Sequence, residues 1–464
     1  MVFSSTVFMF LFLPITLIGY YNPIVRSRGW KNLWLLVLSI GFYAWGEPKM
    51  VLLMLMSILV NWFLGLFVVP GTTRGKVMVT LAVCYNLGVL FLFKYLNFAC
   101  DNLNYFLGLT LSVRKIALPI GVSFFTFQSM SYVIDVYRGK GEKQKNPLNI
   151  GLYISFFPQL IAGPIVRYET VAAEIKHRKE NWHDFCEGMV RFLLGVAKKV
   201  LISNQVALIA DQCFGTVGDL SVAMAWTGAL AYTLQIYFDF SGYSDMAIGL
   251  GQMFGFHFLE NFDYPYMSKS VTEFWRRWHI SLGTWFRDYV YFPLGGSRVN
   301  SKTRLIFNLF VVWSLTGIWH GANWTFILWG IMYFVLLAIE KLIGLPQKVG
   351  KVGHIYTLFW VIIGWVIFRA DNMGMAFSYI GQMFGLSGNV LVNAVVVDVW
   401  GKYGLWMLLG ILFSMPVKNW ITAKLGTNKC WTGWVYGAAV LALAVLSIAA
   451  IANATYNPFI YFNF

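Results

Sequence analysis

The sequence has few charged residues for its length. Only 12% of its 464 residues are Asp, Glu, Lys or Arg, whereas 58% are hydrophobic. A soluble globular domain carries roughly 25% charged residues, so this chain lacks the polar side chains that would cover a water-facing surface. Its mean hydropathy is +0.63. The composition excludes a water-soluble protein and predicts a surface that faces lipid.

Paired cysteines and several common catalytic motifs are also absent. The cysteines are Cys84, Cys100, Cys186, Cys213 and Cys430. Their scattered positions, without a Cys-x-x-Cys pair, argue against a disulfide framework and a thiolate metal site. The chain has no P-loop, His-Glu-x-x-His motif, Gly-x-Ser-x-Gly elbow or complete Rossmann glycine fingerprint. We therefore expect no metal and no tightly bound cofactor, and no serine hydrolase, ATPase or dehydrogenase.

Acidic residues are outnumbered by basic ones. The 35 Lys and Arg against 20 Asp and Glu give a net charge of +15. The basic residues lie in short loops between apolar runs; Arg26, Arg28 and Lys31, for example, follow the first run. This is the pattern of cytoplasmic loops in a membrane protein, not of a nucleic-acid-binding surface. We expect a multi-pass protein of the cell (inner, cytoplasmic) membrane with its N-terminus outside.

Apolar runs of membrane-spanning length recur along the whole chain. About 20 apolar residues cross a bilayer, and tilted or broken helices use fewer. The runs lie at approximately 7–21, 32–46, 50–70, 77–94, 118–137, 148–165, 189–212, 222–240, 303–317, 324–343, 354–369, 402–416 and 434–453. The glycine-rich stretch 242–259 could span or be re-entrant. We expect an all-α polytopic fold of about ten to thirteen transmembrane helices, with residues 1–464 as a single membrane domain.

The stretch 260–300 is too charged to cross the membrane. At helical spacing Trp275, His279 and Phe286 share one face, and Arg276 and Arg287 share another. Aromatic and charged faces on one helix are typical of an interfacial or re-entrant helix beside an aqueous cavity.

His320 is the strongest candidate for a catalytic residue. An ionisable side chain inside an apolar run is costly to desolvate, which makes it a candidate functional site, and a neutral imidazole can act as a general base. Gly317 and Gly321 allow close approach of a helix or ligand. Asn323 is a possible polar partner. The alternative is a histidine that only hydrogen-bonds a neighbouring helix.

A second histidine and two carboxylates accompany it. His279 could assist His320 or orient substrate, or else anchor an amphipathic helix at the interface. Asp239 and Asp245 lie where one apolar helix is expected to end and the next to begin. At that depth they need a partner such as Arg276 or a histidine, so we expect structural ion pairs ahead of direct catalysis.

Several motifs, in order along the chain, resemble those of the membrane-bound O-acyltransferases, within them the bacterial alginate O-acetyltransferase-like branch. They are Leu118-Pro-Ile-Gly-Val-Ser-Phe-Phe-Thr-Phe-Gln128, Phe157-Pro-Gln-Leu-Ile-Ala-Gly-Pro-Ile165, the run around Asp239, Phe274-Trp-Arg-Arg-Trp-His279 and Gly317-Ile-Trp-His-Gly321. The N-terminal Phe-Ser-Ser and Tyr43-Ala-Trp-Gly46 match too, so the resemblance covers essentially the whole chain.

The resemblance implies a helical fold around a central tunnel, with His320 and His279 as the catalytic histidines. The supporting or tunnel residues would be Gln128, Asp239, Asp245, Arg276, Arg277, Trp319 and Asn323. It also implies an acetyl group carried by a thioester donor, either acetyl-CoA or an acyl carrier protein. The eventual acceptor would be a secreted or cell-surface polysaccharide, as in alginate biosynthesis, reached through a periplasmic or extracellular acetyltransferase partner.

The C-terminal run Asn457-Pro-Phe-Ile-Tyr-Phe-Asn-Phe464 is similar to the end of the small partner protein of teichoic acid D-alanylation, whose transferase is similar to this branch. That similarity makes Tyr461 a possible acyl carrier, against the alternative of an aromatic interfacial anchor.

Other functional classes are a polytopic transporter or channel, an acyltransferase that modifies lipids and a structural scaffold. No inverted repeat supports the transporter, and a scaffold would leave His320 unexplained.

Overall fold

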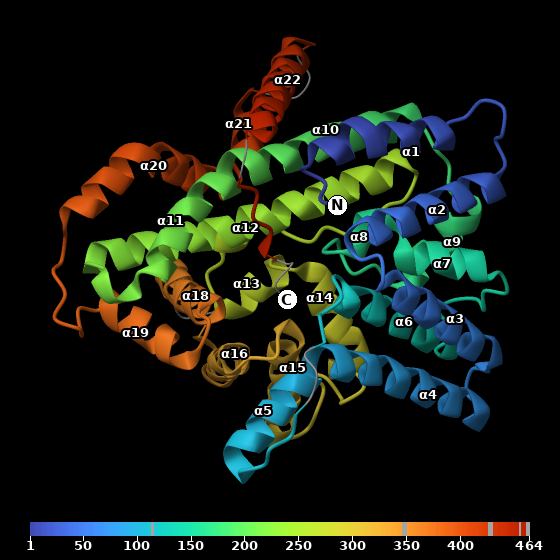
Figure 1. Cartoon of the computed structure of the whole chain (residues 1–464), viewed down its shortest axis with the longest axis horizontal. Coiled ribbons are helices and arrows are strands. Elements are labelled where there is room, and N and C mark those ends of the chain that lie inside the picture. The colour runs from blue at the N-terminus through green and yellow to red at the C-terminus, as the bar shows by residue number, and fades with distance from the viewer. Residues whose placement is uncertain (113–115, 346–349, 426–429, 454–455, 461–464) are drawn as a thin grey trace. The chain divides into compact units, whose positions relative to one another are not determined.

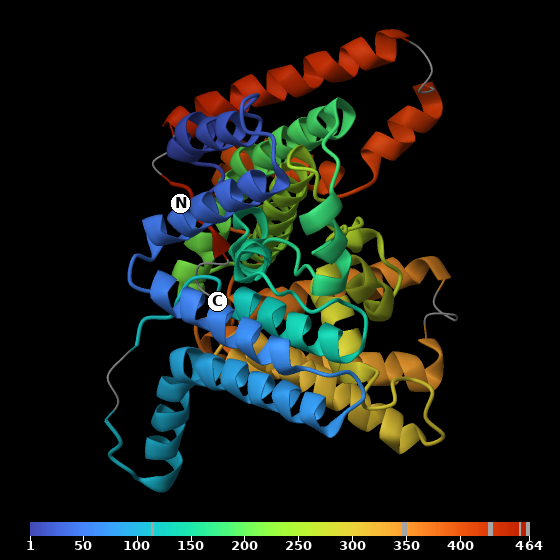
Figure 2. The ribbon, with the colours of Figure 1, turned by 90° about the vertical axis from the view of Figure 1, so that its right-hand side faces the viewer.

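The structure is a computed structural model, and it describes residues 1–112, 116–345, 350–425, 430–453 and 456–460. Helices form the regular structure of these residues, which contain no β-strand; an isolated antiparallel bridge joins Phe262 and Trp278. Figures 1 and 2 show the helices from two directions. The predicted all-α fold is confirmed.

The helices group into two compact units, each made of two stretches of the chain. Unit 1 comprises Met1–Phe192 and Tyr243–Leu259, and unit 2 comprises Leu193–Gly242 and Glu260–Phe464. The prediction of a single domain stays a prediction.

Unit 1 is built around a helix that is buried on all sides. Its helices are η1 (Phe8–Phe12), α1 (Leu13–Tyr20), α2 (Arg28–Gly46), α3 (Val51–Phe67), α4 (Thr73–Leu90), η2 (Phe91–Tyr95), α5 (Leu96–Leu107), α6 (Val122–Tyr137), α7 (Pro147–Ser155), α8 (Phe157–Leu160), α9 (Tyr168–His177) and most of α10 (Trp182–Ala197). Helix α6 packs against α3, α4, α7 and α9. Polar residues such as Gln128 and Asp135 therefore lie inside the unit.

The helices of unit 2 include a closely packed pair. The helices are η3 (Lys198–Ser203), α11 (Asn204–Gly215), η4 (Val217–Asp219), η5 (Pro265–Met267), α13 (Val271–Arg277), α14 (Ile280–Phe286), η6 (Arg287–Tyr291), α15 (Lys302–His320), α16 (Trp324–Ile343), η7 (Gly350–Val352), α18 (Gly353–Arg369), α19 (Met373–Met383), α20 (Ala394–Phe413), α21 (Val417–Leu425) and α22 (Cys430–Asn453). Helices α15 and α16 form this pair, and α13 packs on α16 and α18.

Glycines let α15 and α16 approach closely. A Cβ atom on Gly317 would lie 2.5 Å from the carbonyl oxygen of Phe326, and one on Gly330 would lie 2.6 Å from that of Trp313. Backbone cannot yield to such a clash, so both positions require glycine. The crossing fixes the end of α15, which is His320.

Several helices are suited to cross a membrane. Six described helical segments are long and apolar enough, and two shorter apolar helices, Phe8–Tyr20 and Val51–Phe67, accompany them. The six are Thr73–Leu107, Trp182–Gly215, Trp324–Ile343, Gly350–Arg369, Ala394–Phe413 and Gly433–Asn453. The protein is a multi-pass membrane protein, and the expected number of ten to thirteen spans stays a prediction.

Two expected element boundaries are wrong. Helix α12 (Val222–Met253) belongs to unit 2 as far as Gly242 and to unit 1 from Tyr243 onward. It runs unbroken through Asp239 and Asp245, where we expected a break. Conversely, the stretch expected to form one amphipathic helix through His279 is two short helices, because His279 adopts a left-handed backbone conformation between α13 and α14.

Candidate active site

His320 is the last residue of α15 and lies in unit 2. The helix ends there because Gly321 is extended, and Asn323 then caps α16 by accepting a hydrogen bond from the amide of Thr325 (3.1 Å). Only 5% of His320 is exposed. The helix end therefore presents an imidazole in the interior of the unit, which is costly unless the side chain has a role.

Aromatic rings surround His320. The rings of Trp319 and Trp329 lie 4.9 Å from the imidazole, centre to centre, and that of Phe368 lies 5.1 Å away, all nearly perpendicular to it. Edge-to-face packing of this kind fixes the orientation of the imidazole without supplying a charge. The cage also limits access of water to any group that reacts there.

His279 is held in one tautomer. Asn261 Oδ1 lies 3.1 Å from His279 Nδ1 and also accepts the backbone amide of Ser281 at 3.2 Å. Since a backbone amide can only donate, the Asn261 atom is the oxygen, and His279 Nδ1 must carry the proton. Nε2 then holds the free lone pair.

The environment of His279 also favours the neutral imidazole. The residue is 3% exposed, and its burial lowers the pKa of His279 to about 3. Nε2 is buried and has no hydrogen-bond partner among the described residues. The ring of Phe240 meets the imidazole edge-on at 4.6 Å. An oriented, neutral imidazole with an available lone pair is suited to accept a proton or a hydrogen bond.

One indole contacts both histidines. The ring centre of Trp319 lies 4.9 Å from that of His320 and 6.2 Å from that of His279. The two histidines, 41 residues apart in the sequence, therefore belong to one cluster in unit 2, as do Asn261 and Phe240. The arrangement provides two imidazoles in a largely apolar, water-poor setting.

Glu340 holds the start of α13, the helix that leads to His279. It was not among the residues predicted for the site. Its carboxylate, 1% exposed, accepts hydrogen bonds from the amides of Val271 (2.7 Å) and Thr272 (2.8 Å) and from the Thr272 hydroxyl (2.6 Å). These are the first residues of α13. The signal was available: a carboxylate within an apolar span marks a site by default.

The two aspartates of α12 form ion pairs, but not with the expected partners. Asp239 pairs with Lys199 at 2.6 Å within unit 2, and Asp245 pairs with Arg191 at 2.9 Å within unit 1. The expected partner, Arg276, is exposed on α13. The expected partners were wrong because α12 is continuous. Its two aspartates face Arg191 on α10 and Lys199 on η3.

Arg277 and Asn323, which were also predicted as site residues, bind other partners than the two histidines. Arg277 pairs with Glu273 and Asp263 at 3.0 and 3.2 Å. Asn323 donates to the Asp371 carbonyl and caps α16, so it is not the polar partner of His320.

Two further predicted residues are not among the described residues of unit 2. Gln128 belongs to unit 1, where its amide atoms are buried without a hydrogen-bond partner among the described residues. Tyr461 lies outside the described residues.

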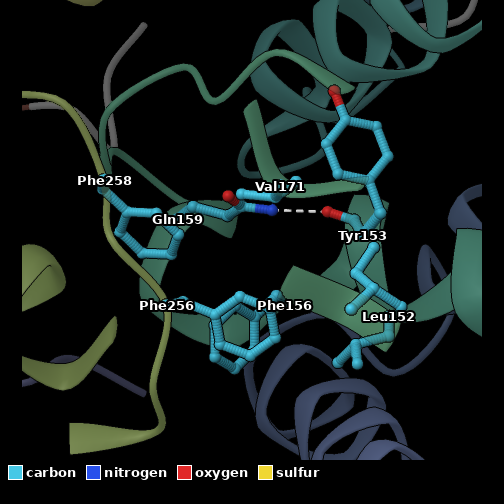
Figure 3. A pocket seen from close by; sticks show the side chains of 8 residues that line it. Leu152, Tyr153, Phe156, Gln159, Val171, Phe256 and Phe258 are labelled. Atoms are coloured by element: carbon cyan, nitrogen blue, oxygen red, sulfur yellow. Dashed lines mark hydrogen bonds between the residues drawn. The ribbon is translucent and has the colours of Figure 1, made fainter. Parts of the chain in front are cut away.

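Unit 1 contains a small cavity (Figure 3). Its lining residues are Leu152, Tyr153, Phe156, Gln159, Val171, Ile175, Phe256 and Phe258. Gln159 is 1% exposed, and its amide nitrogen donates to the Tyr153 carbonyl. The lining is mostly apolar, and the hydroxyl of Tyr153, one of its two polar side chains, donates to the Val166 carbonyl at 2.9 Å.

One group of side chains has the spacing of a metal site. The ligand atoms of His183, Asp184 and Glu187 lie within 4.8 Å of one another in unit 1. Asp184 also contacts His257. His183 and Glu187 are exposed, and such groups are common without an ion, so nothing assigns a metal to them.

Known proteins are similar to this chain, some of them over its whole length. A profile of the membrane-bound O-acyltransferase family matches residues 40–368. The probable alginate O-acetylase AlgI of Pseudomonas putida is 41% identical over 496 aligned residues, which cover 100% of both chains. The peptidoglycan O-acetyltransferase of Helicobacter pylori is 30% identical over 100% of this chain and 98% of its own. The teichoic acid D-alanyltransferase of Bacillus subtilis is 30% identical over 47% of this chain and 58% of its own.

The matched region contains both histidines of the cluster, the indole that contacts them and the carboxylate that anchors α13. A full-length relative at 41% identity and the family match agree on the class of protein. They favour an enzyme over the transporter that the sequence left open. The chain belongs to the membrane-bound O-acyltransferase family and is an O-acyltransferase.

Proposed function

We propose that this enzyme transfers an acetyl group from a cytoplasmic thioester to hydroxyl groups of a cell-surface polysaccharide, with a partner protein completing the delivery. The proposal places it in the cytoplasmic membrane. Relatives named for acetylation of alginate and peptidoglycan support the acetyl group and the polysaccharide acceptor. The observation that carries the chemistry is the buried cluster in which Trp319 contacts both His320 and His279.

The reaction needs one base and one leaving group. In the proposed mechanism His320 takes the proton of the acceptor hydroxyl as the oxygen attacks the thioester carbonyl. The lone pair on His279 Nε2 accepts a hydrogen bond from a second hydroxyl of the acceptor sugar, which orients the attacking hydroxyl toward the carbonyl. The carbon–sulfur bond then breaks, and the thiolate leaves with the proton from the His320 imidazolium. The aromatic rings limit competing hydrolysis of the thioester.

Access to the cluster has to open during turnover. His320 is 5% exposed and His279 is 3% exposed, which leaves little room for an acyl donor. Opening of side chains or segments on the microsecond to millisecond scale is common in enzymes that exclude water from a reaction. The donor is acetyl-CoA or an acyl carrier protein, and no tightly bound cofactor takes part.

Purified enzyme in lipid nanodiscs, given isotope-labelled acetyl thioester and alginate or peptidoglycan fragments with and without a partner acetyltransferase, tests the proposal. His320→Ala should lower kcat about 100- to 10,000-fold, the usual contribution of a general base. His354→Ala, in α18 outside the cluster, is the matched control. Retained transfer by His320→Ala would refute the role of His320 as general base. Label recovered only in lipid would show that the acceptor is a lipid and not a polysaccharide.

Tyr461 remains a proposed acyl carrier. Intact-mass analysis of enzyme quenched during turnover should show an acetyl adduct on the C-terminal peptide that Tyr461→Phe removes. An unmodified peptide under conditions of active transfer would exclude this role.

A further inference from the structure

The C-terminal segment 456–460 is bound along η3, α11 and α12 of unit 2; in Figure 1 it is the red segment that crosses α12. Polar contacts follow one another along it. The Tyr456 hydroxyl donates to Asp211, Asn204 Nδ2 donates to Asn457 Oδ1 (3.3 Å), Lys199 Nζ donates to the Pro458 carbonyl, and the Ile460 amide donates to Asp239 Oδ2 (2.8 Å).

Three of the four groups that receive the segment, Lys199, Asn204 and Asp211, share one face of η3 and α11, and the fourth, Asp239, lies on α12. Lys199 lies in the π-helical turn Lys198–Ser203, whose wider pitch brings residues i and i+5 onto one side, so Lys199 and Asn204 align. Asn204 and Asp211 are two α-helical turns apart, which keeps them on the same side. Asp211 is itself held by Arg369 at 3.0 Å. The segment therefore meets an ordered row of polar groups.

The centre of this row is a buried ion pair that the segment completes. The side chains of Lys199 and Asp239 are 4% and 1% exposed and lie 2.6 Å apart. A buried pair is favourable only when its remaining hydrogen-bonding capacity is used. The segment supplies the carbonyl of Pro458 to the ammonium and the amide of Ile460 to the carboxylate. Gly242 lets α12 lie close to the backbone that carries Lys199, since its Cβ would lie 2.8 Å from the Gly195 carbonyl oxygen and 3.3 Å from the Lys199 amide nitrogen.

The same turn of α12 touches the candidate active site. Phe240, which follows Asp239, packs edge-on against His279 at 4.6 Å between ring centres. We propose that Lys199 and Asp239 form a docking site for the C-terminal segment, and that the docked segment fixes the α12 turn that holds Phe240 against His279. Lys199 and Asp239 are then positioning residues, and their effect on rate rests on the proposed role of His279.

Docking of the C-terminal segment can be tested by a measurement that does not depend on enzyme activity. Hydrogen–deuterium exchange of the C-terminal peptide in nanodiscs should show a protected Ile460 amide. Lys199→Met and Asp239→Asn should each speed its exchange about 10- to 100-fold, the range for losing a hydrogen bond to a charged group. Lys199→Arg should retain protection, and Lys302→Met, an exposed lysine at the start of α15, should change nothing. Equally fast exchange in the unaltered protein and in Lys199→Met would overturn the docking.

A double-mutant cycle tests whether docking of the C-terminal segment affects the rate of acyl transfer. Lys199→Met should lower kcat by up to about 100-fold, as expected for misplacement of a catalytic group, while KM for the thioester changes less than about twofold. Ile460→Pro, which removes the amide that donates to Asp239 and keeps Tyr461, should do the same. Because both changes act through one contact, combining them should add nothing further.

The two measurements separate the possible failures. Additive effects of Lys199→Met and Ile460→Pro would show that the ion pair only supports packing, and would overturn the positioning role. Faster exchange with unchanged kcat would overturn it too. Absence of acyl transfer by the unaltered enzyme would refute the proposed function, and the exchange experiment would still decide the docking.

Discussion

Replacement of Glu340 by leucine should destabilise unit 2 and impair catalysis together. Leucine has a similar size but leaves the amides of Val271 and Thr272 buried without an acceptor, while the Thr272 hydroxyl can turn to another group. A hydrogen bond to a charged group contributes about 1.5–3 kcal/mol, so two lost bonds amount to about 3–6 kcal/mol. The larger buried apolar surface of leucine offsets about 1–2 kcal/mol. The net loss is about 2–4 kcal/mol.

This loss is large beside a typical unfolding free energy of about 5–15 kcal/mol. Tryptophan fluorescence during heating at a fixed scan rate should show an apparent midpoint lower by about 5–15 °C. Glu340→Gln keeps one acceptor oxygen and should fall between the leucine variant and the unaltered protein. Glu187→Leu, at an exposed carboxylate, serves as the control. Because α13 leads into His279, kcat should fall with the midpoint, and an unchanged midpoint with full activity in Glu340→Leu would refute the reasoning.

Two further changes test the packing of α15 and a pH-sensitive contact. Gly317→Ala forces a methyl group against a backbone carbonyl of α16 and should cost about 1–3 kcal/mol, seen as a lower unfolding midpoint, whereas Gly401→Ala, with open space around it, should have no such effect. His257 contacts Glu174 and Asp184 at 3.0 and 3.2 Å; partial burial lowers the pKa of His257, but these hydrogen bonds and charges outweigh it and raise the pKa. The contact should stabilise unit 1 fully below about pH 6.5 and be lost as pH rises through the raised pKa, by less than ~1 kcal/mol at this half-exposed site. His257→Gln should abolish that slope in midpoints measured between about pH 5.5 and 8.5, and an unchanged slope would contradict the assignment.

The class of fold was predictable because it depends on local signals, whereas the catalytic roles of His320 and His279 stay predictions. Long apolar runs give membrane-spanning helices whatever their partners are, and a histidine next to such a run is expensive unless it has a role. Gly317 was also correctly interpreted as a point of close helix contact, since only glycine leaves that space.

Partners distant in the sequence were not predictable in this way. Lys199 as the partner of Asp239, and Glu340 as the anchor of α13, depend on tertiary packing that no periodicity encodes. The break at His279 was missed for a related reason: the spacing fits one helix, but a bridge between Phe262 and Trp278 and the hydrogen bonds of Asn261 stabilise a turn instead. Local propensity sets a preference of tenths of a kcal/mol per residue, which such contacts exceed.

The backbone of His279 limits which residues can replace it. Its φ of +46° lies in a region that histidine, asparagine and aspartate visit more readily than most side chains, and that β-branched residues essentially avoid. A saturation library at this codon should therefore yield folded protein with Asn, Asp or Gly and unfolded or poorly expressed protein with Val, Ile or Thr. His279→Asn is consequently the substitution of choice for trapping a donor complex, because it keeps the chain path while removing the imidazole.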